Sequence, residues 1–234
     1  MSLLTLVQSA TRRLGLNVPA AVATSTDPAV LQIMELASEE GQEMAARTNW
    51  SFLTQQATFT TVATENQGLI TTIAPALKFI INETIWNRTL RRPVFGPLSP
   101  QQWQQMEAMV MQGPWNQWRI VGQYLKFIPV PAAGQSCYFE YVSKNWGLAN
   151  DGVTGKSAYS ADSDTALLDE NIMVLGLIWR WRAAKGLDFT ADLAKYESKV
   201  LDAIGRDGSK PILSMGDVRY DIFPGVFVPA GSWN

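Results

Sequence analysis

The sequence predicts an α+β protein, in which a four-helix bundle carries an inserted β-rich module and ends in an extended C-terminal arm. Three observations predict this fold class. The stretch from Leu167 to Lys185 has apolar residues on two helical faces at once, and a helix that is apolar around most of its circumference is a buried one. Residues 50–144 alternate apolar and polar side chains between turn signals, as strands do. Residues 208–234 lose all periodicity and contain three prolines.

Two helices are predicted at residues 1–49. Ser2 is placed to cap the first helix and Gly15 to end it. Asp27 followed by Pro28 is typical of an N-cap and a first helical turn, and the apolar spacing continues to about Arg47. These helices supply two of the neighbours that the buried helix requires.

The other two bundle helices are predicted within residues 145–207. Gly186 is placed to end the buried helix in a left-handed conformation, and Thr190 is placed to cap a last amphipathic helix. We expect Trp179 and Trp181 to be core residues of the bundle, because they belong to the two apolar faces. Residues 145–165 are rich in Gly, Ser, Asn and Asp without periodicity, so they are predicted to form a long loop.

Residues 50–144 are predicted to form the inserted module. One helix is expected inside it, since Ser99, Pro100 and Gln102 make a capping box with proline at the first helical position. The remaining apolar stretches are expected to be strands, at residues 57–62, 80–86, 90–95, 118–121, 124–128 and 136–142.

Composition excludes several kinds of chemistry. The chain of 234 residues has no histidine, and Cys137 is its single cysteine. Ser-His-Asp triads, Cys/His nucleophiles, zinc sites and disulfides are therefore not expected. A net charge of −2 argues against a large non-specific nucleic-acid surface. The first residues lack a basic region and a cleavage site, so we expect no signal peptide and a chain kept in the cytoplasm.

The stretch from Asn150 to Ser157 resembles a nucleotide-binding loop. It ends in Gly155-Lys156-Ser157, as a phosphate-binding loop does. However, Asn150 stands where the first glycine belongs, and no helix is predicted directly after Ser157. A nucleotide-dependent enzyme built on Lys156 is thus an alternative, and a surface loop is the preferred interpretation.

The acidic residues within 162–170 could in principle bind calcium. Asp162, Asp164, Asp169 and Glu170 lack the further ligands and the glycine of an EF-hand loop. Acidic residues before a helix are ordinary capping groups, which is the preferred interpretation. A Ser143-Lys144 pair is discarded because adjacent strand residues point to opposite faces. No metal and no cofactor are expected.

Nine tryptophans are a large number for a chain with few charges. Trp115, Trp118 and Tyr124 could stack on sugar rings, which would make the chain a Trp-rich carbohydrate- or protein-binding module. Packing inside the β-rich module is the preferred interpretation, because tryptophan is also a common core residue.

Several segments, in order, resemble the head-to-tail adaptor (connector) family of bacteriophages. They are Thr84–Thr89, Gly96–Trp103, Ile128–Pro131 followed by Phe139–Lys144, and Ser160–Thr165 followed by Leu175–Leu187. None is a catalytic motif, so the resemblance depends on their order, which extends from the second to the fourth helix.

The resemblance implies a structural virion protein without enzymatic activity. Such adaptors have a helical bundle with an inserted β-domain and a C-terminal arm. They form a ring, typically of twelve copies, beneath the portal protein, where they extend the DNA channel and dock the tail or nozzle protein during virion assembly. DNA would pass through the lumen without specific binding, and no membrane is involved. The resemblance also implies localisation in the virion neck, after assembly in the host bacterial cytoplasm.

The arm is predicted to be the surface that binds the portal or a neighbouring copy. Ordering 27 residues costs a few tens of kcal/mol at about 1–2 kcal/mol each. Its large apolar side chains recover about 1.5–3 kcal/mol each when buried, so another chain must supply part of the binding surface. The side chains expected to bind are Ile212, Leu213, Tyr220, Ile222, Phe223, Phe227 and Trp233.

Overall fold

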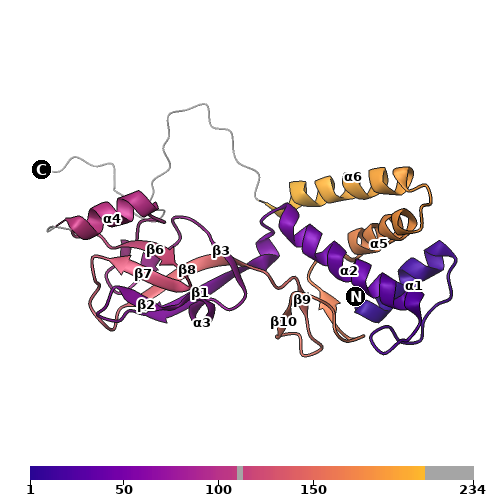
Figure 1. Cartoon of the computed structure of the whole chain (residues 1–234), viewed down its shortest axis with the longest axis horizontal. Coiled ribbons are helices and arrows are strands. Elements are labelled where there is room, and N and C mark those ends of the chain that lie inside the picture. The colour runs from indigo at the N-terminus through magenta and orange to yellow at the C-terminus, as the bar shows by residue number, and fades with distance from the viewer. Residues whose placement is uncertain (110–112, 209–234) are drawn as a thin grey trace, which may run out of the picture.

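The computed structural model describes residues 1–109 and 113–208. Within these residues, six α-helices and three antiparallel sheets form an elongated molecule with two parts (Figure 1). We call residues 1–53 and 144–208 the helical body, and residues 54–143 the β body. No helix in the described ranges is both long and apolar enough to cross a membrane.

The first two helices begin where their capping residues predict. Helix α1, Leu3–Leu14, begins after Ser2, whose hydroxyl accepts a hydrogen bond from a backbone amide of the first turn, and it ends at the left-handed Gly15 (φ 70°). Helix α2, Pro28–Arg47, begins after Asp27, whose carboxylate accepts from the Ala29 amide. Both predicted helices are confirmed.

Helix α5, Glu170–Ala184, is the buried helix of the molecule. It contacts α1, α2 and α6 (Thr190–Asp207), and nine of its fifteen residues are buried. Gly186 follows it with a φ of 68°, as predicted. The cap predicted for α6 is wrong, because Thr190 is the first helical residue and the Asp188 carboxylate accepts its backbone N–H instead.

The two tryptophans of α5 differ in burial. Trp181 is buried, so its predicted place in the core is confirmed. Trp179 is only half-buried, against Phe189 and Tyr196. Arg180, between them in the helix, is buried at 6% exposure.

Two sheets make up the β body. The larger has the order β1-β8-β4-β5 with β3 also paired to β8, and the smaller has the order β2-β7-β6. The strands of the larger sheet are β1 Thr54–Thr60, β3 Leu77–Ile80, β4 Trp86–Asn87, β5 Arg92–Pro93 and β8 Ser136–Ser143. Those of the smaller are β2 Asn66–Leu69, β6 Gln117–Val121 and β7 Tyr124–Ile128.

Strand predictions hold best where no residue has a positive φ. Strands β6, β7 and β8 agree with their predicted ranges to within one residue. The strands predicted at residues 80–86 and 90–95 are broken into shorter pieces, since Glu83 (φ 64°) and Arg91 (φ 55°) are left-handed and cannot continue an extended chain. Helix α4, Pro100–Ala108, begins with the predicted capping box, while the short α3, Ile70–Ile73, was not predicted.

The core of the β body lies between its two sheets. Phe127 from β7 and Phe139 from β8 both pack against Phe59 of β1, with ring centroids 5.7 and 6.2 Å apart. Cys137 is also buried there, and burial raises the pKa of its thiol to about 11. This cysteine is therefore a packing residue.

The predicted four-helix bundle with an inserted module is wrong. Residues 145–165 are not one long loop: β9 (Gly147–Leu148), β10 (Gly155–Lys156) and β11 (Thr165–Ala166) form a third sheet beside the helices. Trp146, in the same stretch, belongs to the helical core and lies so close to Gly41 of α2 that a Cβ there would be 2.4 Å from its ring.

The physical reason for this correction lies in α5. A helix apolar on all sides needs a cover on all sides, and α1, α2 and α6 leave part of it to other segments. The core that includes α5 also contains side chains from the strand β8 and from the third sheet region, which are Val142, Trp146 and Tyr159. Val142 of β8 and the third sheet region thus complete the helical core, so the four helices do not form a closed bundle by themselves.

The predicted C-terminal arm, residues 208–234, lies outside the described residues except for Gly208. The predicted domain boundaries at residues 49, 144 and 207 stay predictions.

Candidate functional site

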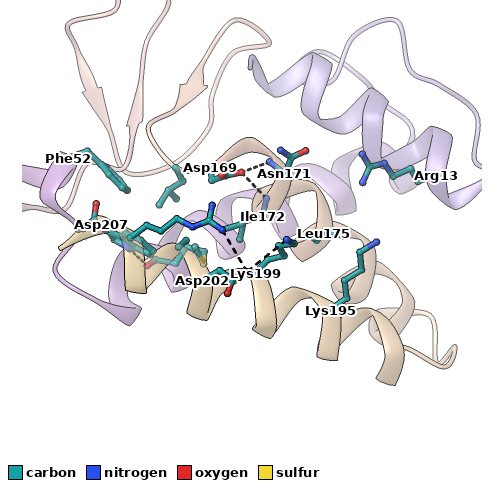
Figure 2. Close-up of a pocket in the computed structure, with 15 residues that line it drawn as sticks. Arg13, Phe52, Asp169, Asn171, Ile172, Leu175, Lys195, Lys199, Asp202 and Asp207 are labelled. Carbon is teal, nitrogen blue, oxygen red and sulfur yellow. Dashed lines mark hydrogen bonds and ion pairs between the residues drawn. The ribbon is translucent and has the colours of Figure 1, made fainter. Parts of the chain in front are cut away.

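The helical body contains a groove. It has a volume of about 550 Å³ and lies between α5 and α6, with α1 at one end and the connection from α2 to β1 at the other (Figure 2). Small-molecule and peptide sites commonly have volumes of about 300–1,000 Å³. The groove is therefore large enough to receive part of another molecule.

The floor of the groove is apolar because α5 has no polar face. Ile172 and Leu175 of α5 lie beneath it, with Leu168 just before the helix. Helix α6 covers α5 with Tyr196 and Val200, but its next inward residue is the small Ala203. A larger side chain at that position would fill part of the space, so the groove follows directly from the sequence of α6.

One end of the groove is fixed by hydrogen bonds. The Asp207 carboxylate accepts from the backbone N–H and the hydroxyl of Ser51, both at 2.8 Å, which joins the end of α6 to the connection before β1. The indole of Trp50 donates to the Met44 carbonyl at 2.7 Å. Phe52 stacks on Trp50 and remains 37% exposed at the groove. This end is thus a rigid apolar wall.

The rim of the groove carries cations that are incompletely paired. Lys199 and Arg206 share Asp202, at 3.9 Å each. Arg13 of α1 and Lys195 of α6 have no acidic group within 4.0 Å among the described residues. Asp169 is occupied as the N-cap of α5, accepting from the amides of Asn171 and Ile172. The site therefore combines an apolar floor with unpaired positive charge.

The groove offers apolar contacts and charged groups to a bound molecule. The lining residues include no serine, cysteine, histidine or tyrosine, and two of the three carboxylates cap or join helices. Across the described ranges, no group of three or more His, Cys, Asp or Glu side chains could hold a metal ion.

The Lys156 loop is not built as a phosphate site. Gly155 and Lys156 form the strand β10, and no helix begins after Ser157. The Lys156 ammonium is held by Asp164 at 2.8 Å and by the Ser160 hydroxyl. Asp164 is 2% exposed and also accepts from the amides of Ser160 and Ala161, and although burial opposes it, these bonds keep its pKa low. This lysine is therefore a structural group.

Of the four acidic residues expected to be capping groups, Asp169 alone caps a helix, and Asp162, Asp164 and Glu170 bond other parts of the chain. Asp169 caps α5. Asp162 accepts hydrogen bonds from the amides of Val22 and Ala23, at 3.0 and 2.7 Å, and so joins the third sheet region to the connection between α1 and α2. Ser143, of the Ser143-Lys144 pair discarded as a catalytic candidate, is buried.

The three aromatic residues considered for sugar binding do not form one surface. Trp118 is 3% exposed in the core of the β body, whereas Trp115 and Tyr124 are 42% and 43% exposed. Trp115 packs edge-on against Phe95, with Arg92 above its ring. The structure thus does not bring these residues together as a flat stacking platform.

An ion network between α2, α5 and α6 was missed entirely by sequence reasoning. Arg180 donates to Glu40 at 2.7 Å and to Glu39 at 2.9 Å, and it also bonds Glu43. Tyr196 donates to the other oxygen of Glu40 at 2.7 Å.

A small residue provides the space for this network. Glu40 is fully buried beneath Gly176, where a Cβ would lie 2.2 Å from its carboxyl carbon. The sequence signal was a glycine in the middle of an otherwise large, apolar helix.

The predicted arm residues, Ile212, Leu213, Tyr220, Ile222, Phe223, Phe227 and Trp233, all lie outside the described residues. Comparison with known proteins adds no relative: no protein-family model matches the chain, and no curated protein matches it significantly.

Proposed function

We propose that this protein is a structural head-to-tail adaptor of a bacteriophage virion. In this role it forms a ring beneath the portal protein, extends the DNA channel and docks the tail or nozzle protein. Its site of action is the virion neck, after assembly in the host bacterial cytoplasm. The proposal begins from the resemblance of several segments, in order, to phage adaptors.

The observation that carries the proposal furthest is the place of those segments in the fold. Ser160–Thr165 contains the two aspartates that tie the third sheet region together, and Leu175–Leu187 contains Gly176 and Arg180 of the buried network. Two of the family-like segments thus coincide with the joints of the helical body.

Charge supports a conduit role. The helical body contains eleven Lys and Arg residues against fifteen Asp and Glu, a net charge of −4. An acidic surface does not retain DNA, since affinity for the DNA backbone rises with each phosphate that a protein neutralises. A channel lined by such a surface would let DNA slide.

The test uses the purified protein, a truncated form ending at Gly208, and candidate portal proteins. Electron microscopy of the mixture should show a ring of the full-length protein on the portal. The truncated form should keep the melting temperature of the full-length chain, because the described helices and sheets end before residue 209, but it should not join the portal. Normal assembly of the truncated form would remove the arm from the proposed binding surface. Absence of any portal-bound ring of the full-length protein would refute the adaptor role.

A further inference from the structure

The tip of the hairpin β9–β10 carries an exposed apolar side chain. Val153 is 82% exposed, the highest value among the large hydrophobic residues of the described ranges. Scattered exposed apolar residues are normal. Val153 is unusual because the backbone around it is held in one shape.

Hydrogen bonds fix this tip. The Asp151 carboxylate accepts from the backbone N–H groups of Val153 and Thr154, at 2.9 and 2.8 Å, and from the Thr154 hydroxyl at 2.5 Å. The Ala149 amide donates to the Thr154 carbonyl, and Gly152 takes a positive φ of 68°. The Thr154 hydroxyl and the backbone N–H groups lower the pKa of Asp151 to about 2, so the tip is anionic at neutral pH. Binding by such a tip needs little ordering of the backbone.

The groove between α5 and α6 has the complementary properties. Its floor is apolar, and Arg13 and Lys195 on its rim have no acidic partner within 4.0 Å among the described residues. A volume of about 550 Å³ is ample for a valine side chain with its adjacent carboxylate. Charge complementarity of this kind orients a partner and excludes like-charged surfaces.

One copy cannot make this contact with itself. The β9–β10 hairpin projects from the side of the helical body opposite to α6, with α2 between them (Figure 1). No residue of the hairpin tip, 149–154, lines the groove, so the two are separate surfaces of one molecule. Such a pair makes a head-to-tail contact that repeats from copy to copy and produces a ring when the rotation closes.

We propose that the β9–β10 tip of one copy inserts Val153 into the α5–α6 groove of the next copy, with Asp151 facing Arg13 and Lys195. The proposal deepens the proposed function, since it names the contact between neighbours of the adaptor ring. The partner is a second copy of this chain.

The first experiment compares two exposed apolar residues. Val153→Ser removes the inserted side chain, while Leu201→Ser changes a residue of α6 that is 66% exposed and does not line the groove. Analytical ultracentrifugation over a concentration series, with and without portal, measures assembly. Val153→Ser should raise the concentration at half-assembly about tenfold or more, as expected for losing one buried valine, and Leu201→Ser should leave it unchanged. Unchanged assembly of Val153→Ser would overturn the proposed contact.

The second experiment uses introduced cysteines in the full chain. Cys137 is buried, so added surface thiols dominate mild oxidation. The variant Val153→Cys/Ala203→Cys should form a ladder of cross-linked multimers, because Ala203 lines the groove. The control Val153→Cys/Ser198→Cys, with an exposed residue of the same helix that does not line the groove, should not. Equal ladders from both variants would contradict insertion.

These results separate the contact from the adaptor role. Portal-bound rings that form equally with Val153→Ser would refute the contact and leave the adaptor proposal standing. A ladder specific to Ala203→Cys, without any portal-bound ring, would support the contact and refute the adaptor role.

Discussion

The two bodies of the molecule bury polar groups in different ways. In the helical body, Glu40 and Arg180 are buried charges that join three helices. In the β body, the four buried polar side chains of the described residues are neutral, and all bond to loops: Thr61, Gln67, Asn87 and Ser143. Polar burial therefore joins whole elements in one body and shapes turns in the other.

This difference has an energetic consequence. Removing one member of a buried ion pair leaves an uncompensated charge in the protein interior, which is strongly destabilising. Removing a neutral amide that bonds a loop destabilises the protein less, because the polar groups of the loop can bond water instead. The helical body should thus be the more sensitive of the two to single polar substitutions.

The largest effect is expected for Arg180→Met. Glu40 is fully buried and would lose its principal cationic partner, at a cost of about 3–5 kcal/mol in the free energy of unfolding. Urea denaturation measures it. Arg182→Met is the control, since Arg182 is 39% exposed in its ion pair with Asp192 and such pairs contribute about 0–1 kcal/mol. Equal losses in the two variants would mean that the network does not tie the helices together.

An intermediate effect is expected for the glycines of the helical body. Gly176→Ala would place a Cβ 2.2 Å from the Glu40 carboxyl carbon, and overpacking of this kind costs about 1–3 kcal/mol. Gly205→Ala in α6 meets nothing within 4 Å and should stabilise the protein by about 0.5–1 kcal/mol, because alanine favours helix. Melting temperatures of both variants should therefore move in opposite directions. A stabilising Gly176→Ala would show that Glu40 lies elsewhere.

The smallest effect concerns pH. Burial raises the pKa of Glu40, against the opposing hydrogen bonds from Tyr196 and Arg180. A raised folded-state pKa contributes stability that is fully present below the unfolded value of 4.5 and is lost as pH rises through the folded value. Glu43 and Glu197 have lowered pKa values, since hydrogen bonds from Arg180 and Arg47 to Glu43, and from Arg47 to Glu197, outweigh desolvation. Their stabilisation is present above 4.5 and is lost on acidification.

Because these contributions have opposite signs, the pH dependence of stability should differ between the wild type and a variant without the Glu40 carboxyl group. Glu40→Gln removes the one carboxyl group of the network that gains stability in acid. The wild type should therefore gain stability relative to the variant as the pH falls from 7 to 4.5. Urea midpoints measured at three pH values would give both slopes. Parallel curves would indicate that Glu40 titrates as an ordinary exposed carboxyl group.

Local patterns predicted the elements of this fold well. Ser2, Asp27 and the Ser99 capping box begin helices where expected, because a cap involves groups within four residues of one another. Two strands were overextended, since nothing in the alternation of residues 80–95 reveals that Glu83 and Arg91 have positive φ. The architecture was wrong because Trp146 and Tyr159, in a stretch without periodicity, belong to the helical core.

The candidate site was beyond local reasoning. The groove depends on which residues of α6 lie over Ile172 and Leu175, and the unpaired state of Arg13 and Lys195 depends on the positions of every acidic group nearby. Lys156 gives a second example. Its sequence context resembles a phosphate-binding loop, but in the structure its ammonium group is paired with Asp164.

By itself, the sequence determined the helix ends, the buried character of α5 and the absence of histidine and disulfide chemistry. These properties depend on composition and on neighbours along the chain. Only the tertiary structure decided that Glu40 and Arg180 meet inside the helical body and that Trp146 and Tyr159 complete its core. These contacts join segments that are far apart in the sequence, and local patterns do not predict which distant segments pack together.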